Sequence, residues 1–95
     1  MSNQADEHQL DVLIHRRAPD ALVVAESRTG APEILLSLLD TLGFARHGAA
    51  IYVWHELPED QDPTEISRTC LRAHKALTAA RYAVKVDDRL LQQHG

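Results

Sequence analysis

Ala50-Ile51-Tyr52-Val53-Trp54-His55 is the clearest strand pattern in the chain. Side chains alternate between the two faces of a strand, so Ile51, Val53 and His55 share one face, while Tyr52 and Trp54 share the other. Both faces are substantially apolar. This favours a strand at the centre of a sheet or at an interface.

The segment around this strand predicts a β-hairpin from Phe44 to Leu57, with His47-Gly48 as its turn. Two further strands are expected. Residues 21–25 form a short apolar run rich in β-branched side chains, which is typical of a buried strand. Residues 82–86 form the last strand.

Two amphipathic helices are expected between the strands. The first begins near residue 31 and ends at Gly43, a residue suited to a left-handed C-cap. The second runs from Pro63 to about Arg81, with Asp62 as N-cap and Glu65 completing a capping box. Their apolar stripes are Ile34, Leu35, Leu38, Leu39 and Leu42 in the first, and Ile66, Cys70, Ala73, Leu77 and Ala80 in the second.

Helices are also predicted at both ends of the chain. From Ala5 to Arg17, Leu10, Leu13 and Ile14 recur at helical spacing, and acidic residues precede basic ones, which suits the helix dipole. A short helical end follows Asp87.

The resulting order is α-β-α-β-β-α-β, which predicts an α+β fold. Residues 21–86 follow the β-α-β-β-α-β order of the split βαβ or ferredoxin-like fold, behind an N-terminal helix. A winged-helix-like fold is the alternative, but it needs two consecutive helices before the hairpin and only one is predicted. At 95 residues the chain has room for one domain, expected over residues 5–95 behind a flexible tail of residues 1–4.

Composition limits the classes of function. The net charge of −4 disfavours nucleic acid as a partner without excluding it. No apolar run approaches the ~20 residues that cross a bilayer, so no membrane partner is expected. No secretory signal pattern opens the chain, and its single cysteine cannot form an intrachain disulfide. A cytoplasmic location is therefore expected.

The turn Ser27-Arg28-Thr29-Gly30 is a candidate anion site, because it joins a strand to the start of a helix. Its spacing resembles the Ser-x-Thr-Gly phosphate loop of flavodoxins, although the chain is too short for their five-stranded doubly wound sheet. The alternative is that Ser27 or Thr29 caps the helix.

Catalytic and metal-binding patterns are weak. Cys70 and His74 are spaced i, i+4 on one helix, but Cys70 falls on the apolar stripe and paired ligands are missing, so no metal site or cofactor is predicted. His55 and Glu56 are successive strand residues and point to opposite faces, which argues against an acid–base pair. The chain is expected not to be an enzyme.

Two surfaces are candidates for partner binding. Tyr52 and Trp54 share one strand face and are suited either to a partner or to the core. Arg68, Arg72 and Lys75 form a basic stripe on the 63–81 helix. The stripe could follow a phosphate backbone, meet an acidic partner or remain a solvated face. The acidic residues 59–65 could pair with it in a second copy, which favours a dimer.

One further pattern spans residues 30–90. Its parts are Leu42-Gly43-Phe44, then Tyr52-x-Trp54-His55-x-Leu57-Pro58, and finally Leu77-x-x-Ala80-Arg81-Tyr82-x-Val84-x-x-Asp87. This pattern resembles one in small uncharacterised actinobacterial proteins. The resemblance implies a compact α+β fold in a bacterial cytoplasm, and it carries no catalytic residues.

The sequence therefore predicts a non-enzymatic interaction module, a homodimeric regulatory or accessory protein. One alternative is a nucleic-acid-binding transcriptional regulator that uses the basic helix face. Another is a binder of small anionic ligands at residues 27–30.

Overall fold

The structure, a computed structural model, describes residues 3–18, 20–50 and 52–91. Over these ranges the chain has an α+β fold, as predicted, with five strands in one mixed sheet. In chain order the elements are α1 (Gln4–Glu7), β1 (Val12–Arg16), β2 (Val23–Ser27), α2 (Glu33–Thr41), β3 (Ala45–Ala49), β4 (Tyr52–Glu56), α3 (Pro63–Ala79), β5 (Val84–Val86) and α4 (Asp88–Leu91).

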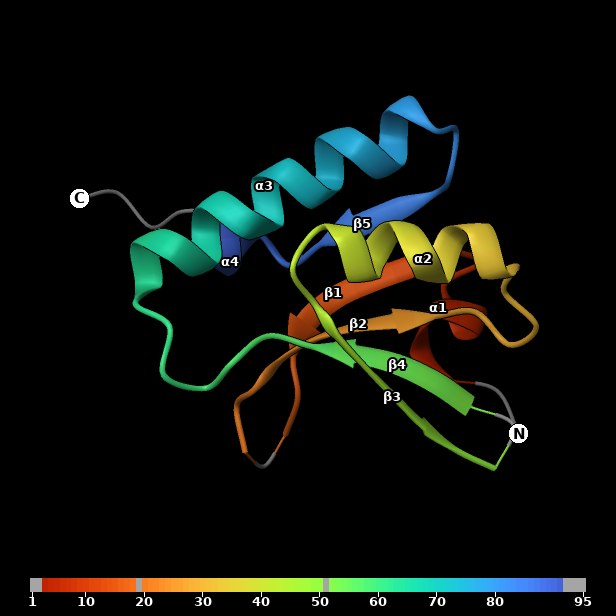
Figure 1. Cartoon of the computed structure of the whole chain (residues 1–95), viewed down its shortest axis with the longest axis horizontal. Helices are drawn as coiled ribbons and strands as arrows, with labels where there is room; N and C mark the ends of the chain where they lie inside the picture. Colours follow the sequence, from red (N-terminus) through yellow and green to blue (C-terminus); the bar gives the residue numbers. More distant parts are fainter. Residues whose placement is uncertain (1–2, 19, 51, 92–95) are drawn as a thin grey trace.

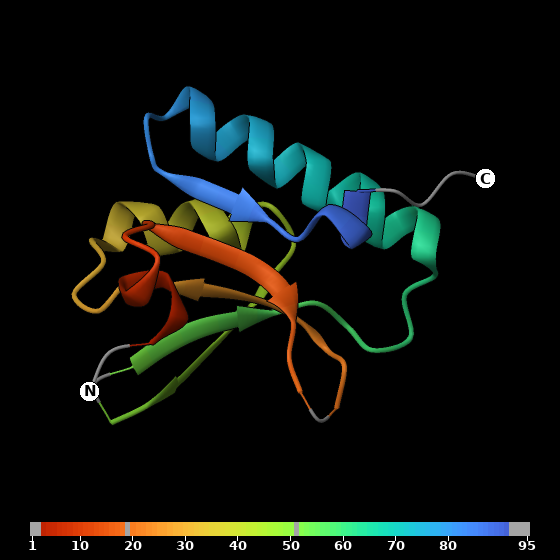
Figure 2. The same ribbon diagram turned by 180° about the vertical axis from the view of Figure 1, so that it is seen from behind.

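The strands follow the order β3-β4-β2-β1-β5 across the sheet. β5 runs parallel to β1, whereas the other neighbouring pairs are antiparallel. Both α2 and α3 lie on one side of this sheet (Figures 1 and 2). Their apolar stripes pack against alternate residues of the strands, such as Ile14 and Ala25, and form the core. The opposite side of the sheet is not covered by either helix.

The predicted N-cap Asp62 and the left-handed Gly43 are confirmed, but the Glu65 side chain accepts from Arg68 instead of completing the predicted capping box. The carboxylate of Asp62 accepts a hydrogen bond from the Glu65 amide at the start of α3. After α2, Gly43 adopts a left-handed φ of 105°, and the Phe44 amide donates back to the Leu39 carbonyl. Phe44 is then buried in the core. Among the helices of the described ranges, none combines the length and hydropathy that a membrane span requires.

The two predicted apolar stripes are correct except at their ends. Ile34 is 73% exposed, because the face of α2 that meets the sheet is centred on Leu35 and Leu39. Ala80 is exposed at the end of α3. Each stripe is therefore narrower than the run of apolar residues in the sequence.

The predicted N-terminal helix over residues 5–17 is wrong. Only Gln4–Glu7 is helical, with Asn3 as its N-cap, and Gln9 adopts a φ of 58°, which ends the helical path. Val12–Arg16 forms β1 inside the sheet, and its first three residues are buried on both faces. A contiguous apolar run suits such a strand, and over so few residues helical spacing does not distinguish the two structures. Met1 and Ser2 of the predicted tail lie outside the described residues.

The position of β1 also separates this sheet from the predicted ferredoxin-like arrangement. From β2 to β5 the elements follow the expected β-α-β-β-α-β order. In a ferredoxin-like sheet the first and last strands of that unit are neighbours, but here β1 lies between β2 and β5. The winged-helix alternative needs two consecutive helices before the hairpin, whereas one helix, α2, lies between β2 and β3.

The predicted hairpin is present, but its turn is not at His47-Gly48. Both of these residues belong to β3, which pairs along its full length with β4, from Ala45 with Glu56 to Ala49 with Tyr52. The chain reverses after Ala49, where Ala50 adopts a φ of 54°. A turn at His47-Gly48 would have left β3 too short to pair with the whole of β4. Ile51, predicted as a strand residue, lies outside the described residues.

Candidate functional site

The face of the sheet opposite α2 and α3 is the candidate functional surface, and we call it the open face. Strand register places on it Leu13 and His15 of β1, Val24 and Glu26 of β2, and Tyr52, Trp54 and Glu56 of β4. The helix α1 packs against β1 and β2 and contributes to the walls of two hollows on this face.

The first hollow has a volume of about 300 Å³ and an apolar floor. Val24, Tyr52 and Trp54 contribute its apolar side chains, while Glu7 and Glu26 contribute carboxylates. Tyr52 and Trp54 are only half-buried. The structure therefore places both predicted aromatic residues on one concave surface outside the main core.

The ring of Trp54 is held in place from two directions. Its indole Nε1 donates a hydrogen bond to Oε2 of Glu56 at 2.8 Å. Its face stacks on the ring of His47, with centroids 5.9 Å apart and an interplanar angle of 14°. Glu56 also accepts from Nη1 of Arg17 at 2.9 Å, and the indole hydrogen bond, together with Arg17, holds the pKa of Glu56 below its ordinary value. The aromatic wall is thus ordered before any partner binds.

The second hollow is larger, about 590 Å³, and more polar. Its floor includes His15 and Glu26, whose Nε2 and Oε1 atoms lie 3.0 Å apart. The hydrogen bond that His15 donates to Glu26 raises the pKa of His15, while burial opposes the shift. Lys85, Asp87 and Arg89 also line this hollow. Charges of both signs therefore surround it.

Sequence reasoning missed His15, Glu26 and Arg17 as members of this surface. His15 and Arg17 lay in the segment that was predicted to be helical. A helix has no alternation between two faces, so that prediction could not place His15 beside Val24 on the sheet. The only sequence signal for Glu26 is its place between the buried residues Ala25 and Ser27, where alternation turns its side chain to the other face.

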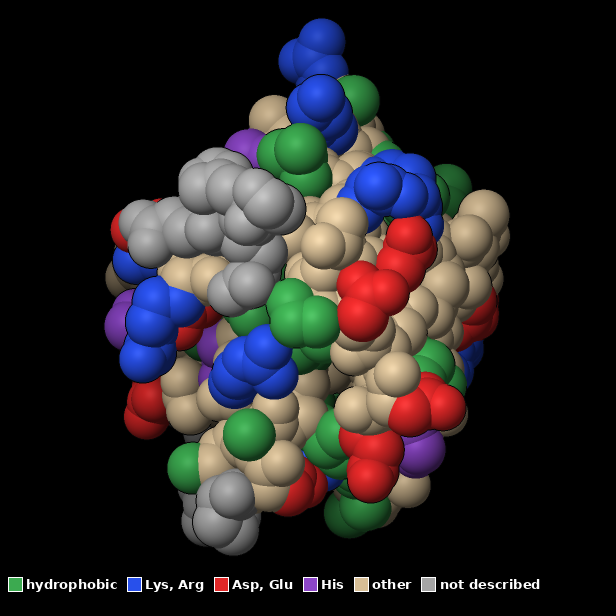
Figure 3. Space-filling model, turned by 90° about the vertical axis from the view of Figure 1, so that its left-hand side faces the viewer, with side chains coloured by type: hydrophobic (Ala, Val, Ile, Leu, Met, Phe, Trp, Pro, Cys, Tyr) green, Lys and Arg blue, Asp and Glu red, His purple; other side chains and the backbone are tan. Residues whose placement is uncertain are grey.

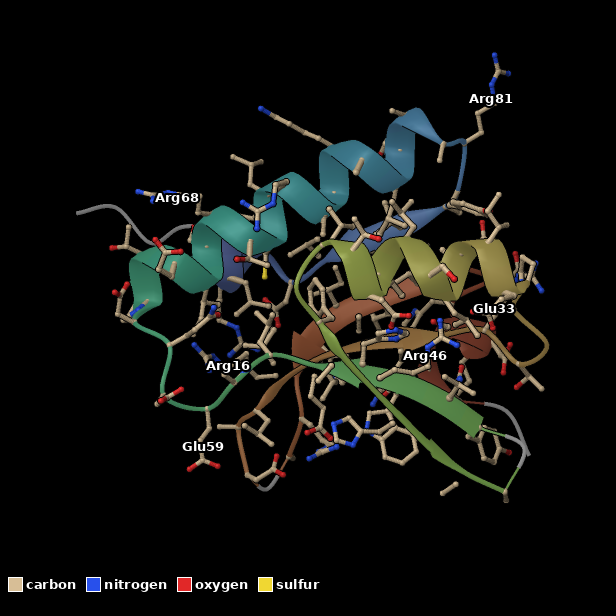
Figure 4. The ribbon with its side chains drawn as sticks, in the orientation of Figure 1. Arg16, Glu33, Arg46, Glu59, Arg68 and Arg81 are labelled. Carbon is tan, nitrogen blue, oxygen red and sulfur yellow. The ribbon has the colours of Figure 1, made fainter. Side chains whose placement is uncertain are left out.

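The basic stripe lies elsewhere. Arg68, Arg72 and Lys75 are exposed on α3, which covers the opposite side of the sheet, so the structure does not bring them together with Tyr52 and Trp54. Figure 4 shows Arg68 pointing away from the sheet. Nη1 of Arg68 lies 3.0 Å from Oε1 of Glu65, so one member of the predicted acidic segment pairs with the stripe within the same chain.

Two features interrupt the stripe as a basic surface. Leu71 is 44% exposed beside its arginine and lysine side chains. On the side of the molecule that Figure 3 shows, Lys and Arg form separate groups with Asp and Glu beside them. Within the described residues, Arg72 and Lys75 make no ion pair.

Arg28 and Thr29 of the 27–30 loop already donate hydrogen bonds within the chain. Asp6 accepts from the Thr29 amide at 3.0 Å and from its hydroxyl at 2.6 Å, and that hydroxyl holds the pKa of Asp6 below its ordinary value. Nε of Arg28 donates to Asp11 at 2.8 Å. Gly30 has a φ of 77°, which completes the turn. A carboxylate from α1 therefore lies where a bound anion would take the same hydrogen bonds.

Neither hydroxyl of this loop caps α2. The N-cap is Pro32, and no side chain bonds to the helix amides there. Ser27 is buried, and its Oγ has no hydrogen-bond partner within the described part of the chain. Its carbonyl accepts from Nδ2 of Asn3 at 2.7 Å, which ties the N-terminal segment to the end of β2.

The remaining reactive side chains are not assembled into a site. His55 lies on the helix-facing side of β4, fully buried, with Nε2 bonded to Oδ1 of Asp40 at 2.8 Å. Cys70 is buried in the core, and burial raises its pKa to about 11. Across residues 3–18, 20–50 and 52–91, no group of three or more His, Cys, Asp or Glu side chains has a metal-binding arrangement.

No protein-family model, curated protein or solved structure matches the chain.

Proposed function

We propose that the protein is a non-enzymatic interaction module, a homodimer that presents the open face of its sheet to a polypeptide partner. One observation carries this proposal: a half-buried, ordered aromatic wall, Tyr52 and Trp54, beside a hollow of about 300 Å³ on the face that α2 and α3 leave uncovered. Aromatic side chains at this kind of position supply large contact area and dominate many interfaces. A regulatory or accessory role in a bacterial cytoplasm fits such a module.

The chemistry of the hollow suggests the kind of segment that it takes. Its floor accommodates one large apolar side chain against Val24 and Trp54. Glu7 and Glu26 stand at its walls, and the single arginine there, Arg17, is already paired with Asp20 and Glu56. Glu26 is already paired with His15, so Glu7 is the carboxylate of the hollow that has no ion pair among the described residues, and a carboxylate beside aromatic rings favours a cation. The partner segment is therefore an apolar side chain flanked by lysine or arginine.

Trp54 is the only tryptophan of the chain, so its fluorescence reports on the hollow directly. The experiment titrates short peptides that hold a central leucine or phenylalanine between lysines, with glutamate-flanked peptides of the same length as the comparison. Lysine-flanked peptides should change the Trp54 emission and bind more tightly. Salt should weaken this preference, because the flanking charges are exposed.

A variant series separates the hollow from the rest of the surface. Binding of a fluorescently labelled peptide, followed by anisotropy, should weaken by about tenfold or more in Tyr52→Ala, as expected for an anchor residue. Lys75→Ala on α3 should bind as the wild type does. Equal affinity for lysine- and glutamate-flanked peptides, or unchanged binding by Tyr52→Ala, contradicts the proposed surface.

A second candidate function rests on α3. The side chains of Arg72 and Lys75 are exposed and, within the described residues, without an ion pair, which favours a phosphate backbone or an acidic protein as partner. Binding of a single- or double-stranded oligonucleotide should then fall steeply with salt and be lost in Arg72→Ala. No binding at low salt eliminates the nucleic-acid function.

A further inference from the structure

The outer edge of the sheet at β3 is a second, separate surface. β3 is the last strand on its side of the sheet, and all five of its residues are exposed. In Figures 1 and 2 no other element lies outside it. Among the described residues, β4 is its one strand partner.

The hydrogen-bond pattern fixes which backbone groups point outward from this edge. The Leu57 amide donates to the Val23 carbonyl at 2.9 Å, so residue 57, and by alternation 55 and 53, bond toward β2. Residues 52, 54 and 56 of β4 therefore bond toward β3, where their partners are Ala49, His47 and Ala45. It follows that the N–H and C=O groups of Arg46 and Gly48 point away from the sheet.

The side chains of β3 do little to protect this edge. Sheet edges are usually blocked by proline, lysine, bulges or very short strands. β3 has five residues, three of which are Ala45, Gly48 and Ala49, and small side chains let another strand approach. Its one arginine, Arg46, turns toward α2, where it pairs with Glu33 at 2.8 Å and Asp40 at 2.7 Å (Figure 4).

The opposite edge of the same sheet differs in each respect. β5 has only three residues, and the middle one is Lys85. α4 follows directly and packs against α3. A sheet with one protected edge and one receptive edge can join a single further strand without growing into a fibre.

We propose that β3 of one copy pairs antiparallel with β3 of a second copy, about a two-fold axis at His47. This inference rests on the homodimer of the proposed function and gives its contact. In this register Arg46 of each copy lies opposite Gly48 of the other. The outward N–H and C=O groups of each such pair form two hydrogen bonds, and the two-fold axis generates the pair twice. Ala45 lies opposite Ala49 of the other copy. The strand is complementary to itself here, because the whole of β3 is paired and no arginine faces another arginine.

Other centres of pairing are poorer. An axis at Arg46 places two guanidinium side chains directly opposite each other, which is destabilising. An axis at Gly48 brings Ala50 into the pairing, but Ala50 is in a turn with a φ of 54°. The His47 axis joins the sheets of the two copies edge to edge, so both open faces are presented on the same side to one partner.

Disulfide trapping tests the register. At the His47 axis the two copies of residue 47 form a non-hydrogen-bonded pair, with Cα atoms about 4.5 Å apart, within disulfide range. Under mild oxidation His47→Cys should give a covalent dimer. Two copies of Ala49 would be separated by about 14 Å along the strands, so Ala49→Cys alone should cross-link about tenfold more slowly or less. A mixture of Ala45→Cys and Ala49→Cys should recover the cross-link as a heterodimer.

A proline substitution tests the backbone bonds without a new thiol. The Gly48 amide points outward, so Gly48→Pro removes an intermolecular donor but no bond of the hairpin. Light scattering during size exclusion should show the monomer, with the circular dichroism spectrum unchanged. Gly48→Ala is the matched control and should remain dimeric, because an added Cβ would meet only the Tyr52 carbonyl oxygen, at 3.6 Å.

The outcomes separate this inference from the proposed function. A dimeric wild type in which His47→Cys cross-links no faster than Ala49→Cys, and in which Gly48→Pro stays dimeric, overturns the β3 contact and leaves the homodimer standing. A wild type that is monomeric at every concentration overturns both. Selective trapping at residue 47, together with a monomeric, folded Gly48→Pro, supports both.

Discussion

His55 and Asp40 join the sheet to the helix layer through one hydrogen bond, 2.8 Å between Nε2 and Oδ1. His55 is fully buried on β4, whereas Asp40 stands near the end of α2 with its carboxylate 43% exposed. The same carboxylate pairs with Arg46 of β3, which lowers its pKa. The Asp40 side chain of α2 therefore bonds to both β3 and β4. Water cannot replace its bond to His55, because the His55 side chain is fully buried.

Asp40→Ala should destabilise the fold through His55. The substitution leaves a buried Nε2 donor without an acceptor, which costs about 1–3 kcal/mol. Urea unfolding, followed by circular dichroism, gives the free energy of unfolding. Asp20→Ala is the control, because Arg17 keeps its second partner, Glu56, when Asp20 is removed. The urea midpoint of this variant should barely move. Equal effects of the two substitutions would contradict a special role for the buried bond.

Asp40→Ala also bears on pH dependence. Burial lowers the pKa of His55, although Asp40 opposes the shift. The unfolded chain thus binds a proton that the folded chain does not, so His55 favours folding above its unfolded pKa of about 6.5 and this contribution is lost as pH falls through the lowered value. Without the opposing carboxylate, the pKa should fall further. The loss of stability on acidification from about pH 7 to 5 should therefore be steeper in Asp40→Ala than in Asp20→Ala.

His15 should contribute to stability with the opposite sign. Its hydrogen bond with Glu26 raises its pKa, so the pair stabilises the fold fully below the unfolded pKa of about 6.5 and the contribution is lost as pH rises through the raised value. His15→Gln should therefore lose more stability relative to the wild type near pH 5.5 than near pH 8.5. Glu26→Gln should reproduce this dependence. A pH-independent loss in both variants contradicts a charged pair.

Local signals in the sequence were sufficient for the elements that are stabilised locally. The caps at Asp62 and Gly43 depend on nearby backbone amides and carbonyls, so residue type and spacing predict them. The same holds for the alternation along β4, which points Trp54 to one face of the sheet and His55 to the other. These features need no knowledge of distant parts of the chain.

The sheet order depends on distant pairings, and there the sequence was insufficient. Val12 to Ile14 is a strand because β2 and β5 pair with it on either side, and nothing within residues 5–17 indicates those neighbours. The hairpin turn was misplaced for the same reason. Glycine at position 48 favours a turn locally, but pairing of the whole of β3 with β4 outweighs the left-handed φ of Ala50. The hollow at Trp54 follows from this tertiary arrangement and could not be predicted before it.

Neighbouring residues of α2 should respond very differently to truncation. Leu35 is fully buried beneath the helix, so Leu35→Ala should cost about 2–5 kcal/mol. Ile34 is 73% exposed, and Ile34→Ala should stay within about 0.5 kcal/mol of the wild type. Thermal and urea unfolding measure both. Similar losses in the two variants would mean that α2 is rotated about its axis relative to the sheet.

Cys70 should report global unfolding through its reactivity. The thiolate is the reactive form, and burial both covers the sulfur and raises its pKa to about 11. A chromogenic disulfide reagent should label native protein slowly, at a rate that rises with urea in step with the unfolded population. Leu71→Cys in a Cys70→Ala background is the matched control, because residue 71 is 44% exposed on the same helix. Its thiol should react at once in native buffer. Labelling of native wild-type protein as fast as this control would place Cys70 outside the core between α3 and the sheet.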